Sequence, residues 1–390
     1  MFNIKKLNAI SDVVYQQLPA EQYTISADLE DTATDAFLVR SANCHDMPLL
    51  DNYLAIARAG AGVNNIPLEA CSKHGIAVFN TPGANANAVK ELVLCGLFLG
   101  SRDIIGGISW AKSLIGQGDQ VGTLVEKGKN QFVGPEVQGK TLGVIGLGAI
   151  GVMVANTAAS LGMKVIGYDP FISIDNAWHL SRAVEHAIHL DDLLSEADYI
   201  TIHVPLMDST RNYLDVAQIE KMKNNVVLLN FARNGLVNEE ALFAALDAGK
   251  VARYITDFPD EACLKHDKVL CIPHLGASTP ESEENCAVMA AEELRYYLEV
   301  GGIRNSVNLP ACQLSPSRHS RMTVIHENIP GIVGKISSTL GEASLNIEEM
   351  VNKSRGNIAY SVFDLNTTPS CEVMKKISAF DGVIKVRAIR

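Results

Sequence analysis

The sequence lacks several features that mark specialised classes of protein. None of its eight cysteines stands in a C-x-x-C pair, so neither a zinc site nor a redox motif is indicated, and we expect reduced thiols and no bound metal. No apolar run is long enough to span a bilayer, and the longest lies around Leu92–Gly100. The N-terminus, MFNIKKLNAI, has no signal-peptide core. These features predict a cytoplasmic protein without a membrane partner.

An excess of basic residues is also absent. The chain of 390 residues carries a formal net charge of −11, whereas non-specific nucleic-acid binding needs a basic surface. Charged residues make up 20% of the chain and apolar residues 47%, a balance that is typical of a packed core and not of a disordered protein. The length allows two or three domains. We therefore expect a globular protein that binds no nucleic acid.

Residues 141–169 form the most informative segment of the chain. Their pattern predicts a strand, a glycine-rich turn, a helix and a second strand. Gly146, Gly148 and Gly151 form G-x-G-x-x-G. The first allows a tight turn, the second lets a pyrophosphate approach the backbone, and the third lets helix and strand pack closely. A lone motif of this kind can be an ordinary turn, but the strand and helix around this one indicate a dinucleotide site at the helix N-terminus.

Asp169 follows the second predicted strand, Lys164–Tyr168, roughly 20 residues beyond the glycines. A carboxylate at this position can accept hydrogen bonds from both ribose hydroxyls, and it repels a 2′-phosphate. No arginine follows Asp169 closely. The predicted cofactor is therefore NAD rather than NADP.

Short apolar strands alternate with helices along most of the chain, which predicts parallel α/β sheets. Residues 1–100 predict one such unit, and residues 85–105 predict a long apolar helix. A connector rich in Gly, Lys and Gln, residues 116–140, leads into a doubly wound Rossmann-type sheet that the two strands of the glycine motif open. The other predicted strands are Phe37–Arg40, Tyr53–Arg58, Ile76–Phe79, Tyr199–His203, Val226–Asn230, Tyr254–Asp257 and Val269–Ile272.

The last 70 residues or so predict a different order of strands and helices. Residues 321–390 predict the order βαββαβ, which is that of a small ferredoxin-like domain. A stretch with turn residues and no helical period, Asn305–Ser320, predicts a linker before it. We therefore expect a Rossmann-type NAD-binding domain inserted into a flavodoxin-like substrate-binding domain, followed by the ferredoxin-like domain. The predicted bounds are 1–94 with 281–310 for the substrate-binding domain, 95–280 for the NAD-binding domain and 320–390 for the last domain.

Three polar residues stand at loop edges just after predicted strands: Arg233 in NFARNG, Glu261 in TDFPDE and His274 in IPHLGAS. Because the ends of strands border the ligand crevice of an open α/β sheet, we expect them to converge. Oxidation of an alcohol needs a base for the hydroxyl proton, which histidine supplies well, and a carboxylate can orient that histidine. A guanidinium can hold a substrate carboxylate through two hydrogen bonds. Each residue alone could be structural, but together they predict a dehydrogenase site.

The motifs VIGLGAIG, YDP, HVPL, NFAR and PHLGAS resemble those of the D-isomer-specific 2-hydroxyacid dehydrogenases, over residues 1 to about 310. The resemblance implies that Arg233, Glu261 and His274 are catalytic. In this family histidine takes the hydroxyl proton, the glutamate supports it, and the arginine orients the substrate carboxylate. The resemblance also implies the following NAD contacts: Gly146, Gly148, Ala149, Ile150, Gly151, Asp169, His203, Val204, Pro205, Phe231, Ala232, Arg233, Asp257, His274, Gly276 and Ala277.

Three N-terminal segments narrow the resemblance to the branch of the family that acts on 3-phospho-D-glycerate. They are LVRSA, ARAGAGVNNI and FNTPGANANAVKEL. They imply oxidation of this phosphorylated hydroxyacid to 3-phosphooxypyruvate, the first step of L-serine synthesis. The alternatives are a dehydrogenase of another 2-hydroxyacid, such as 2-hydroxyglutarate, glyoxylate or D-lactate, and a non-catalytic NAD-binding scaffold. The implied substrate-binding residues are Arg40, Ser41, Arg58, Ala59 and Gly60.

Two positions depart from the family pattern. The stretch ITDFPDEA differs from the family's LDVFEEEP around the glutamate, which leaves Asp260 as an alternative to Glu261. Arg233 is followed by Asn234-Gly235 instead of two glycines. Because asparagine tolerates positive φ, the turn can still form.

Residues 321–390 resemble an ACT domain, a module that binds small amino acids. The matching segments are HENIPGIVGKI and SLNIEEM. The resemblance implies an L-serine effector held by His326, Asn328 and Asn346, at a joint between two subunits of a homodimer or homotetramer. The preceding stretch, SPSRHSRM, lacks the Gly-Gly hinge of the serine-regulated enzymes. Coupling between such a site and the active site would therefore differ here.

Overall fold

The computed structural model describes residues 1–389. The chain divides into two compact units: unit 1 comprises Met1–Ala84 and Glu283–Arg390, and unit 2 comprises Asn85–Ser282. Unit 2 is thus inserted into the sequence of unit 1. The division at Ala84 precedes helix α3 (Ala86–Ser101), whereas the predicted boundary at 94/95 lies within this helix.

The first part of unit 1 is a five-stranded parallel sheet with the order β2-β1-β3-β4-β5, the order of flavodoxin-like sheets. Strands β3 and β5 are buried throughout and consist of apolar residues, as expected for strands of a parallel sheet that is covered on both faces. The long helix α12 contributes Ala287, Ala290 and Leu294 to the same core. The elements are β1 (Phe2–Lys6), α1 (Val14–Gln17), β2 (Tyr23–Ser26), β3 (Ala36–Val39), β4 (Ala55–Arg58), α2 (Leu68–Lys73), β5 (Ala77–Phe79), α12 (Pro280–Arg295) and its π-helical continuation η4 (Tyr296–Val300).

Unit 2 contains a seven-stranded parallel sheet with the order β12-β11-β10-β9-β6-β7-β8. The order reverses between β6 and β9, so the glycine turn that follows β6 lies at the topological switch point, where ligands bind in such sheets. This arrangement confirms the predicted Rossmann-type sheet. The strands are β6 (Thr141–Ile145), β7 (Lys164–Tyr168), β8 (Val184–His186), β9 (Tyr199–Ile202), β10 (Val226–Asn230), β11 (Val251–Thr256) and β12 (Val269–Cys271).

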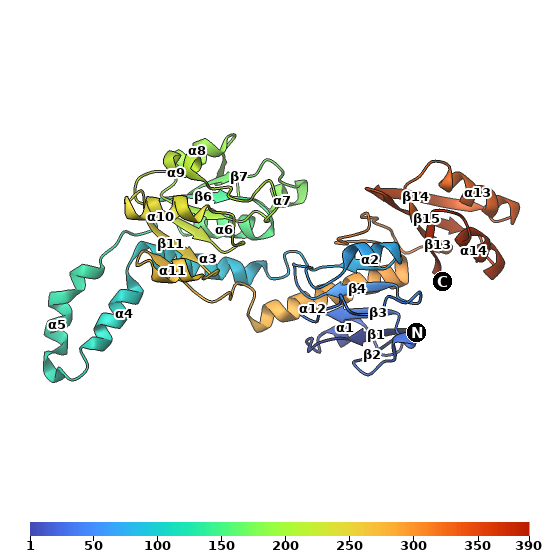
Figure 1. The fold of residues 1–390 in the computed structure, drawn as a ribbon, viewed down its shortest axis with the longest axis horizontal. Helices are drawn as coiled ribbons and strands as arrows, with labels where there is room; N and C mark the ends of the chain where they lie inside the picture. Colours follow the sequence, from blue (N-terminus) through green and yellow to red (C-terminus); the bar gives the residue numbers. More distant parts are fainter. Residues whose placement is uncertain (390) are drawn as a thin grey trace. The chain divides into compact units, whose positions relative to one another are not determined.

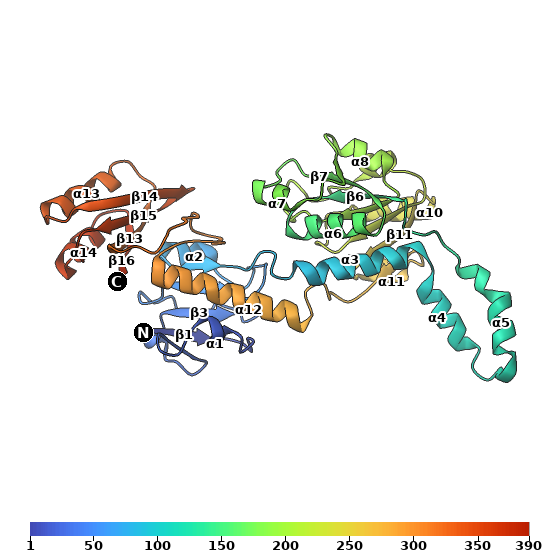
Figure 2. The same cartoon turned by 180° about the vertical axis from the view of Figure 1, so that it is seen from behind.

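Helices cover both faces of this sheet (Figure 2). Helices α3 and α6 share one apolar core with the sheet, through side chains such as Val93 and Val154. Helices α8, α9 and α10 share a second core, through side chains such as Leu193 and Leu242. Besides α3, the α-helices of unit 2 are α4 (Ile104–Ser113), α5 (Val121–Gly128), α6 (Ala149–Ser160), α7 (Ile174–His179), α8 (Leu190–Glu196), α9 (Val216–Lys221), α10 (Glu239–Asp247) and α11 (Glu261–Lys265).

The predicted connector at 116–140 is largely helical. Helices α4 and α5 run side by side as a hairpin at one edge of unit 2 (Figure 1), and the ring of Trp110 lies 5.5 Å from that of Phe132. Neither α4 nor α5 contains a buried residue. The glycine and lysine content therefore misled the prediction: the segment is helical although none of the residues of α4 and α5 is buried.

The C-terminal part of unit 1 is a four-stranded antiparallel sheet with the order β14-β15-β13-β16 and helices α13 and α14 (Figure 1). The observed order βαββαβ confirms the predicted order. Both helices pack on one face of the sheet, with Ile336 and Ile377 in the core. The elements are β13 (Ser320–Glu327), α13 (Ile332–Glu342), β14 (Ile347–Arg355), β15 (Ile358–Leu365), α14 (Cys371–Ser378) and β16 (Val383–Ile389).

Within residues 1–389, no single helix has the length and apolar character needed to cross a membrane. Helices α3 and α4 meet those criteria only as a pair, which is bent by 66° at its break.

Candidate active site

The glycine turn after β6 has the geometry that a dinucleotide requires. Gly146 has a φ of +91°, and a Cβ added there would lie 2.9 Å from the backbone of His203. A Cβ on Gly151 would lie 1.9 Å from the carbonyl oxygen of Gly146, so helix α6 approaches the turn too closely for any side chain. A Cβ on Gly148, in contrast, would meet no atom within 4 Å. The turn is thus closed on the protein side and open at Gly148, as a cradle for a pyrophosphate must be.

Asp169 lies at the end of β7 and braces this turn. Its Oδ2 accepts a hydrogen bond from the backbone N–H of Leu147 at 2.8 Å, and its Oδ1 accepts one from Phe171 at 2.8 Å. Each carboxylate oxygen can accept a further hydrogen bond, so ribose hydroxyls can still bind. The residues of the turn therefore fit the nucleotide that the sequence predicts.

His203 follows β9, next to the glycine turn. Its Nε2 lies 2.9 Å from Thr201 Oγ1, and burial lowers its pKa to about 4. The imidazole is therefore neutral at physiological pH, and its Nδ1 has no hydrogen-bond partner among residues 1–389. Val204 and Pro205 continue this loop along the predicted cofactor side.

Asn230, the last residue of β10, organises the segment Phe231–Arg233. Its Oδ1 accepts hydrogen bonds from the backbone of Ala232 and Arg233, and its Nδ2 donates to the carbonyl of Arg233 at 2.9 Å. The Arg233 guanidinium stays exposed and donates to the carbonyl of Ala232 at 2.7 Å. The sequence prediction missed Asn230, although its place immediately before FAR, at a strand end, is a signal of such a role.

Asp257 is the carboxylate that faces His274. It is fully buried at the end of β11, and its Oδ2 accepts a hydrogen bond from the backbone N–H of Gly276 at 3.3 Å. Burial raises the pKa of Asp257, while the nearby charges of His274 and Arg233 act in the opposite direction. Its Oδ1 has no partner within the described part of the chain, which leaves a buried acceptor for a ligand donor. The ring of His274 packs 4.8 Å from Phe258.

Glu261 and Asp260, the two predicted carboxylate partners of His274, lie at the start of α11. The Glu261 side chain is 83% exposed and forms an ion pair with Lys265, one turn along α11. Asp260 caps the N-terminus of α11 by accepting a hydrogen bond from the backbone N–H of Cys263 at 2.7 Å, which lowers its pKa. Arg233 and His274 follow β10 and β12, the two neighbours of β11, and Asp257 follows β11 itself. The structure shows no contact between Glu261 and His274, because the Glu261 carboxylate pairs with Lys265.

The predicted substrate-binding arginines belong to unit 1. Arg40 Nη2 forms an ion pair with Glu283 Oε1 at 2.6 Å, and the Arg40 side chain is 42% exposed. Arg58 donates from Nε to the carbonyl of Arg40 at 3.0 Å and from Nη1 to the carbonyl of Gly62. The loop after β3, residues 40–42, is held by Asn8, whose Oδ1 accepts hydrogen bonds from its three backbone N–H groups. Arg58 therefore braces the loop that carries the Arg40 guanidinium.

The predicted effector residues differ in exposure. His326 is 1% exposed, and its ring nitrogens lie 2.8 Å from Ser361 Oγ and 2.7 Å from the carbonyl oxygen of Glu327. Asn328 and Asn346 are exposed, and the Asn346 amide donates to Glu348 at 2.8 Å.

Comparison with known proteins agrees with this geometry. Residues 108–276 match the family described as "D-isomer specific 2-hydroxyacid dehydrogenase, NAD binding domain", which confirms the predicted NAD cofactor. Two solved structures share the fold. One is an NAD+-bound 3-phosphoglycerate dehydrogenase from Entamoeba histolytica, with a TM-score of 0.60 and 25% identity, over 79% of this chain and 98% of the other. The other is a D-mandelate dehydrogenase from Rhodotorula graminis, with a TM-score of 0.63 and 21% identity, over 81% and 98%.

The curated relatives are more similar in sequence. The chain is 34% identical to a D-3-phosphoglycerate dehydrogenase from Haemophilus influenzae over 343 residues, which cover 84% of this chain and 79% of the relative. It is 36% identical to one from Archaeoglobus fulgidus over 294 residues, which cover 72% of this chain and 53%, about half, of that relative's length. The chain therefore belongs to the D-isomer-specific 2-hydroxyacid dehydrogenases, the family of NAD-dependent enzymes in which these relatives stand.

Proposed function

We propose that the chain catalyses the NAD-dependent oxidation of 3-phospho-D-glycerate to 3-phosphooxypyruvate, the first step of L-serine biosynthesis. The names of its relatives from H. influenzae and A. fulgidus support this substrate. The observation that carries the proposal is that Arg233, Asp257 and His274 follow the ends of the neighbouring parallel strands β10, β11 and β12. A guanidinium, a carboxylate and a base at one edge of the sheet support the oxidation of a hydroxyacid.

The proposed roles follow from the chemistry of each side chain. His274 accepts the proton of the C2 hydroxyl, and Arg233 holds the substrate carboxylate with its exposed guanidinium. NAD, when bound, supplies the hydride acceptor. Asp257 stabilises the positive charge that His274 gains, because a buried carboxylate interacts strongly with a nearby cation. Glu261 stays a candidate partner of His274, with Asp260 as the alternative.

The phosphate group needs a second cation. Arg40 is suited to this role because only one of its five donors is engaged by Glu283, and its side chain is 42% exposed. Arg58 holds the backbone on which Arg40 stands. An unphosphorylated 2-hydroxyacid would need neither residue, so the substrate class tests this assignment.

We further propose that the C-terminal domain is an ACT domain that binds L-serine through His326, Asn328 and Asn346. The order βαββαβ and the HEN motif support the assignment. L-serine is expected to raise the unfolding temperature of the protein, and Asn346→Ala should remove this effect. An equal shift in both proteins would contradict binding at Asn346.

We also propose that the protein is a homodimer or homotetramer in the cytoplasm, and that the hairpin of α4 and α5 lies in a subunit interface. Support comes from the exposed isoleucines of the hairpin, Ile104, Ile105, Ile108 and Ile115. Apolar surface of this kind is usually covered by a partner.

The function is tested by NADH formation from NAD and 3-phospho-D-glycerate, with removal of the product. We expect turnover of this substrate and much weaker oxidation of D-lactate and 2-hydroxyglutarate. Reduction of glyoxylate with NADH should be similarly weak. His274→Ala should lower kcat by about 10²- to 10⁴-fold, with NAD affinity kept within a factor of a few, because His274 moves the proton. Preference for an unphosphorylated acid would contradict the proposed substrate. Equal loss of turnover and of NAD binding would mean that His274 is structural.

A further inference from the structure

We propose that Arg321 and Arg387 of the C-terminal domain are positioning residues for Arg40, and that they act through helix α12. The inference rests on the proposed function, in which Arg40 binds the substrate phosphate. It assigns a role in the reaction to a sheet that contributes no residue to the nucleotide site. All the residues involved belong to unit 1.

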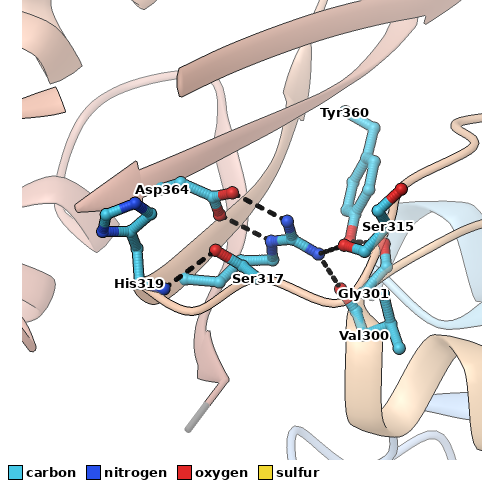
Figure 3. A network of polar contacts seen from close by, with 8 residues as sticks. Val300, Gly301, Ser315, Ser317, His319, Tyr360 and Asp364 are labelled. Carbon is cyan, nitrogen blue, oxygen red and sulfur yellow. Dashed lines mark hydrogen bonds and ion pairs between the residues drawn. The ribbon is translucent and has the colours of Figure 1, made fainter. Parts of the chain in front are cut away.

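The C-terminal sheet caps the carboxyl end of α12 and η4. The last carbonyl groups of a helix have no partner within the helix and carry partial negative charge, so cationic donors stabilise them. Arg387 Nη2 donates to the carbonyls of Tyr297, at 2.9 Å, and of Leu298, and Arg321 Nη1 donates to that of Val300 at 2.7 Å. The Tyr360 hydroxyl donates to the next carbonyl, that of Gly301, at 2.7 Å. Figure 3 shows Tyr360, Val300 and Gly301 at this junction.

Arg321 is itself held rigidly. Its Nε and Nη2 donate to the two carboxylate oxygens of Asp364 at 2.6 and 2.8 Å. Figure 3 shows Asp364 with these two bonds as dashed lines. Both residues are nearly fully buried, at 5% and 4% exposure, and burial strengthens such a bidentate pair. A further bond from Arg321 Nη1 to the carbonyl of Ser315 ties the linker to the same point. The cap on α12 is therefore fixed to the sheet.

Apolar packing makes the junction stiff. Ile325, Tyr360 and Val362, on the sheet face away from α13 and α14, share one core with Tyr297 and Leu298. A Cβ on Gly301 would lie 2.6 Å from Ile389 and 3.0 Å from Thr323, so the chain can pass this close to the sheet only as glycine. Close packing of this kind transmits displacement because it has little free volume.

The other end of α12 reaches Arg40. Glu283, in the first turn of the helix, pairs with the Arg40 guanidinium at 2.6 Å. From Glu283 to Val300 the helix is continuous and roughly 25 Å long. A change in the cap therefore moves Glu283, and with it the guanidinium that meets the phosphate. Glu283 uses one donor of Arg40 and leaves the others for the substrate.

The test compares Arg387→Met, Glu283→Ala and the double variant by steady-state NADH formation. Loss of a side-chain tether costs a ligand about three- to tenfold in affinity. Each single variant should thus raise KM for 3-phospho-D-glycerate by this factor, with kcat and KM for NAD within twofold of the wild type. If both act through one helix, the double variant should resemble the weaker-binding single variant. KM effects that multiply in the double variant would overturn the proposal.

Arg355→Met is the matched control, because Arg355 Nη1 donates to the carbonyl of Ser306 and not to a carbonyl at the end of α12 and η4. It should leave KM unchanged. If Arg387→Met lowers the unfolding temperature but keeps the wild-type KM for 3-phospho-D-glycerate, the proposal is overturned. Arg387 would then stabilise the end of the helix without affecting the substrate. If Arg387→Met does not fold, Tyr360→Phe removes the hydroxyl that donates to the carbonyl of Gly301 and should still raise KM at least twofold; an unchanged KM overturns the proposal. Absence of wild-type turnover would contradict the proposed function and this inference together, whereas wild-type turnover with unaffected variants contradicts this inference alone.

Discussion

Glu293, in the middle of α12, carries a buried carboxyl group whose ionisation is linked to folding. Its Oε1 accepts a hydrogen bond from Asn305 at 2.7 Å, and its Oε2 has no partner among residues 1–389. Burial raises the pKa of Glu293 from 4.5 to about 8. Because the folded state holds the proton more tightly, stability is fully present below about pH 4.5 and falls as the pH rises toward 8.

Glu293→Gln should remove this loss, because glutamine stays neutral and can still accept the bond from Asn305. Thermal unfolding should show equal stability of variant and wild type near pH 4, and a more stable variant at pH 8.5 by up to a few kcal/mol. Glu284→Gln, an exposed residue near the start of the same helix, is the control and should keep the wild-type pH dependence. A pH dependence that Glu293→Gln leaves intact would show that another group titrates.

Arg233 and His274 were predicted because each follows an apolar strand, and the structure places those strands, β10 and β12, on either side of β11. Their catalytic roles stay predictions. Residues such as Asn230 and Glu283 were missed because their roles depend on contacts. Glu283 meets Arg40 across 243 residues of sequence, and no local pattern marks such a pair. Glu261 shows the converse, since its motif position alone does not bring it to His274.

At the scale of elements, the turn between β6 and α6 separates a structural glycine from a functional one. Gly151→Ala should lower the unfolding temperature markedly, because its Cβ would lie 1.9 Å from the Gly146 carbonyl oxygen. Gly148→Ala meets open space at an ordinary φ of −73°, so it should fold normally. Its methyl group would intrude on the pyrophosphate, and KM for NAD should rise at least tenfold. Thermal unfolding and NAD titration check the pair, and unchanged NAD affinity in Gly148→Ala would place the cofactor elsewhere.

The elements that the sequence predicted best are those with one buried face or a completely buried strand. Strands such as β10 have continuous apolar runs, and the bounds of β10, Val226–Asn230, are those predicted. The helix predicted after the glycine turn is α6. The hairpin of α4 and α5 was missed because its apolar residues face no core of the same chain. Periodicity identifies an amphipathic helix only where its apolar side chains form one face toward a core.

At the scale of the whole molecule, the hairpin of α4 and α5 determines whether the protein self-associates. Ile104, Ile105 and Ile108 lie on adjacent turns of α4 with 39%, 43% and 53% exposure, whereas Trp110 packs on Phe132 within the hairpin. An apolar helix face that the chain itself leaves open is stabilised when a second copy covers it. We therefore expect the wild-type protein to self-associate at micromolar concentration.

Ile108→Glu should weaken this association, because an unpaired charge buried in an apolar interface costs about 3–5 kcal/mol. That cost corresponds to a Kd raised by about two to three orders of magnitude, enough to give monomers in sedimentation velocity. Ile174→Glu is the matched control: Ile174 lies on α7, outside the hairpin, and is 77% exposed, so its variant should keep the wild-type mass. Monomeric wild-type protein, or equal dissociation by both variants, would exclude the hairpin as the interface. If Ile108→Glu sediments with the mass of a monomer while Ile174→Glu keeps the wild-type mass, the exposed isoleucines of α4 lie in a contact between subunits.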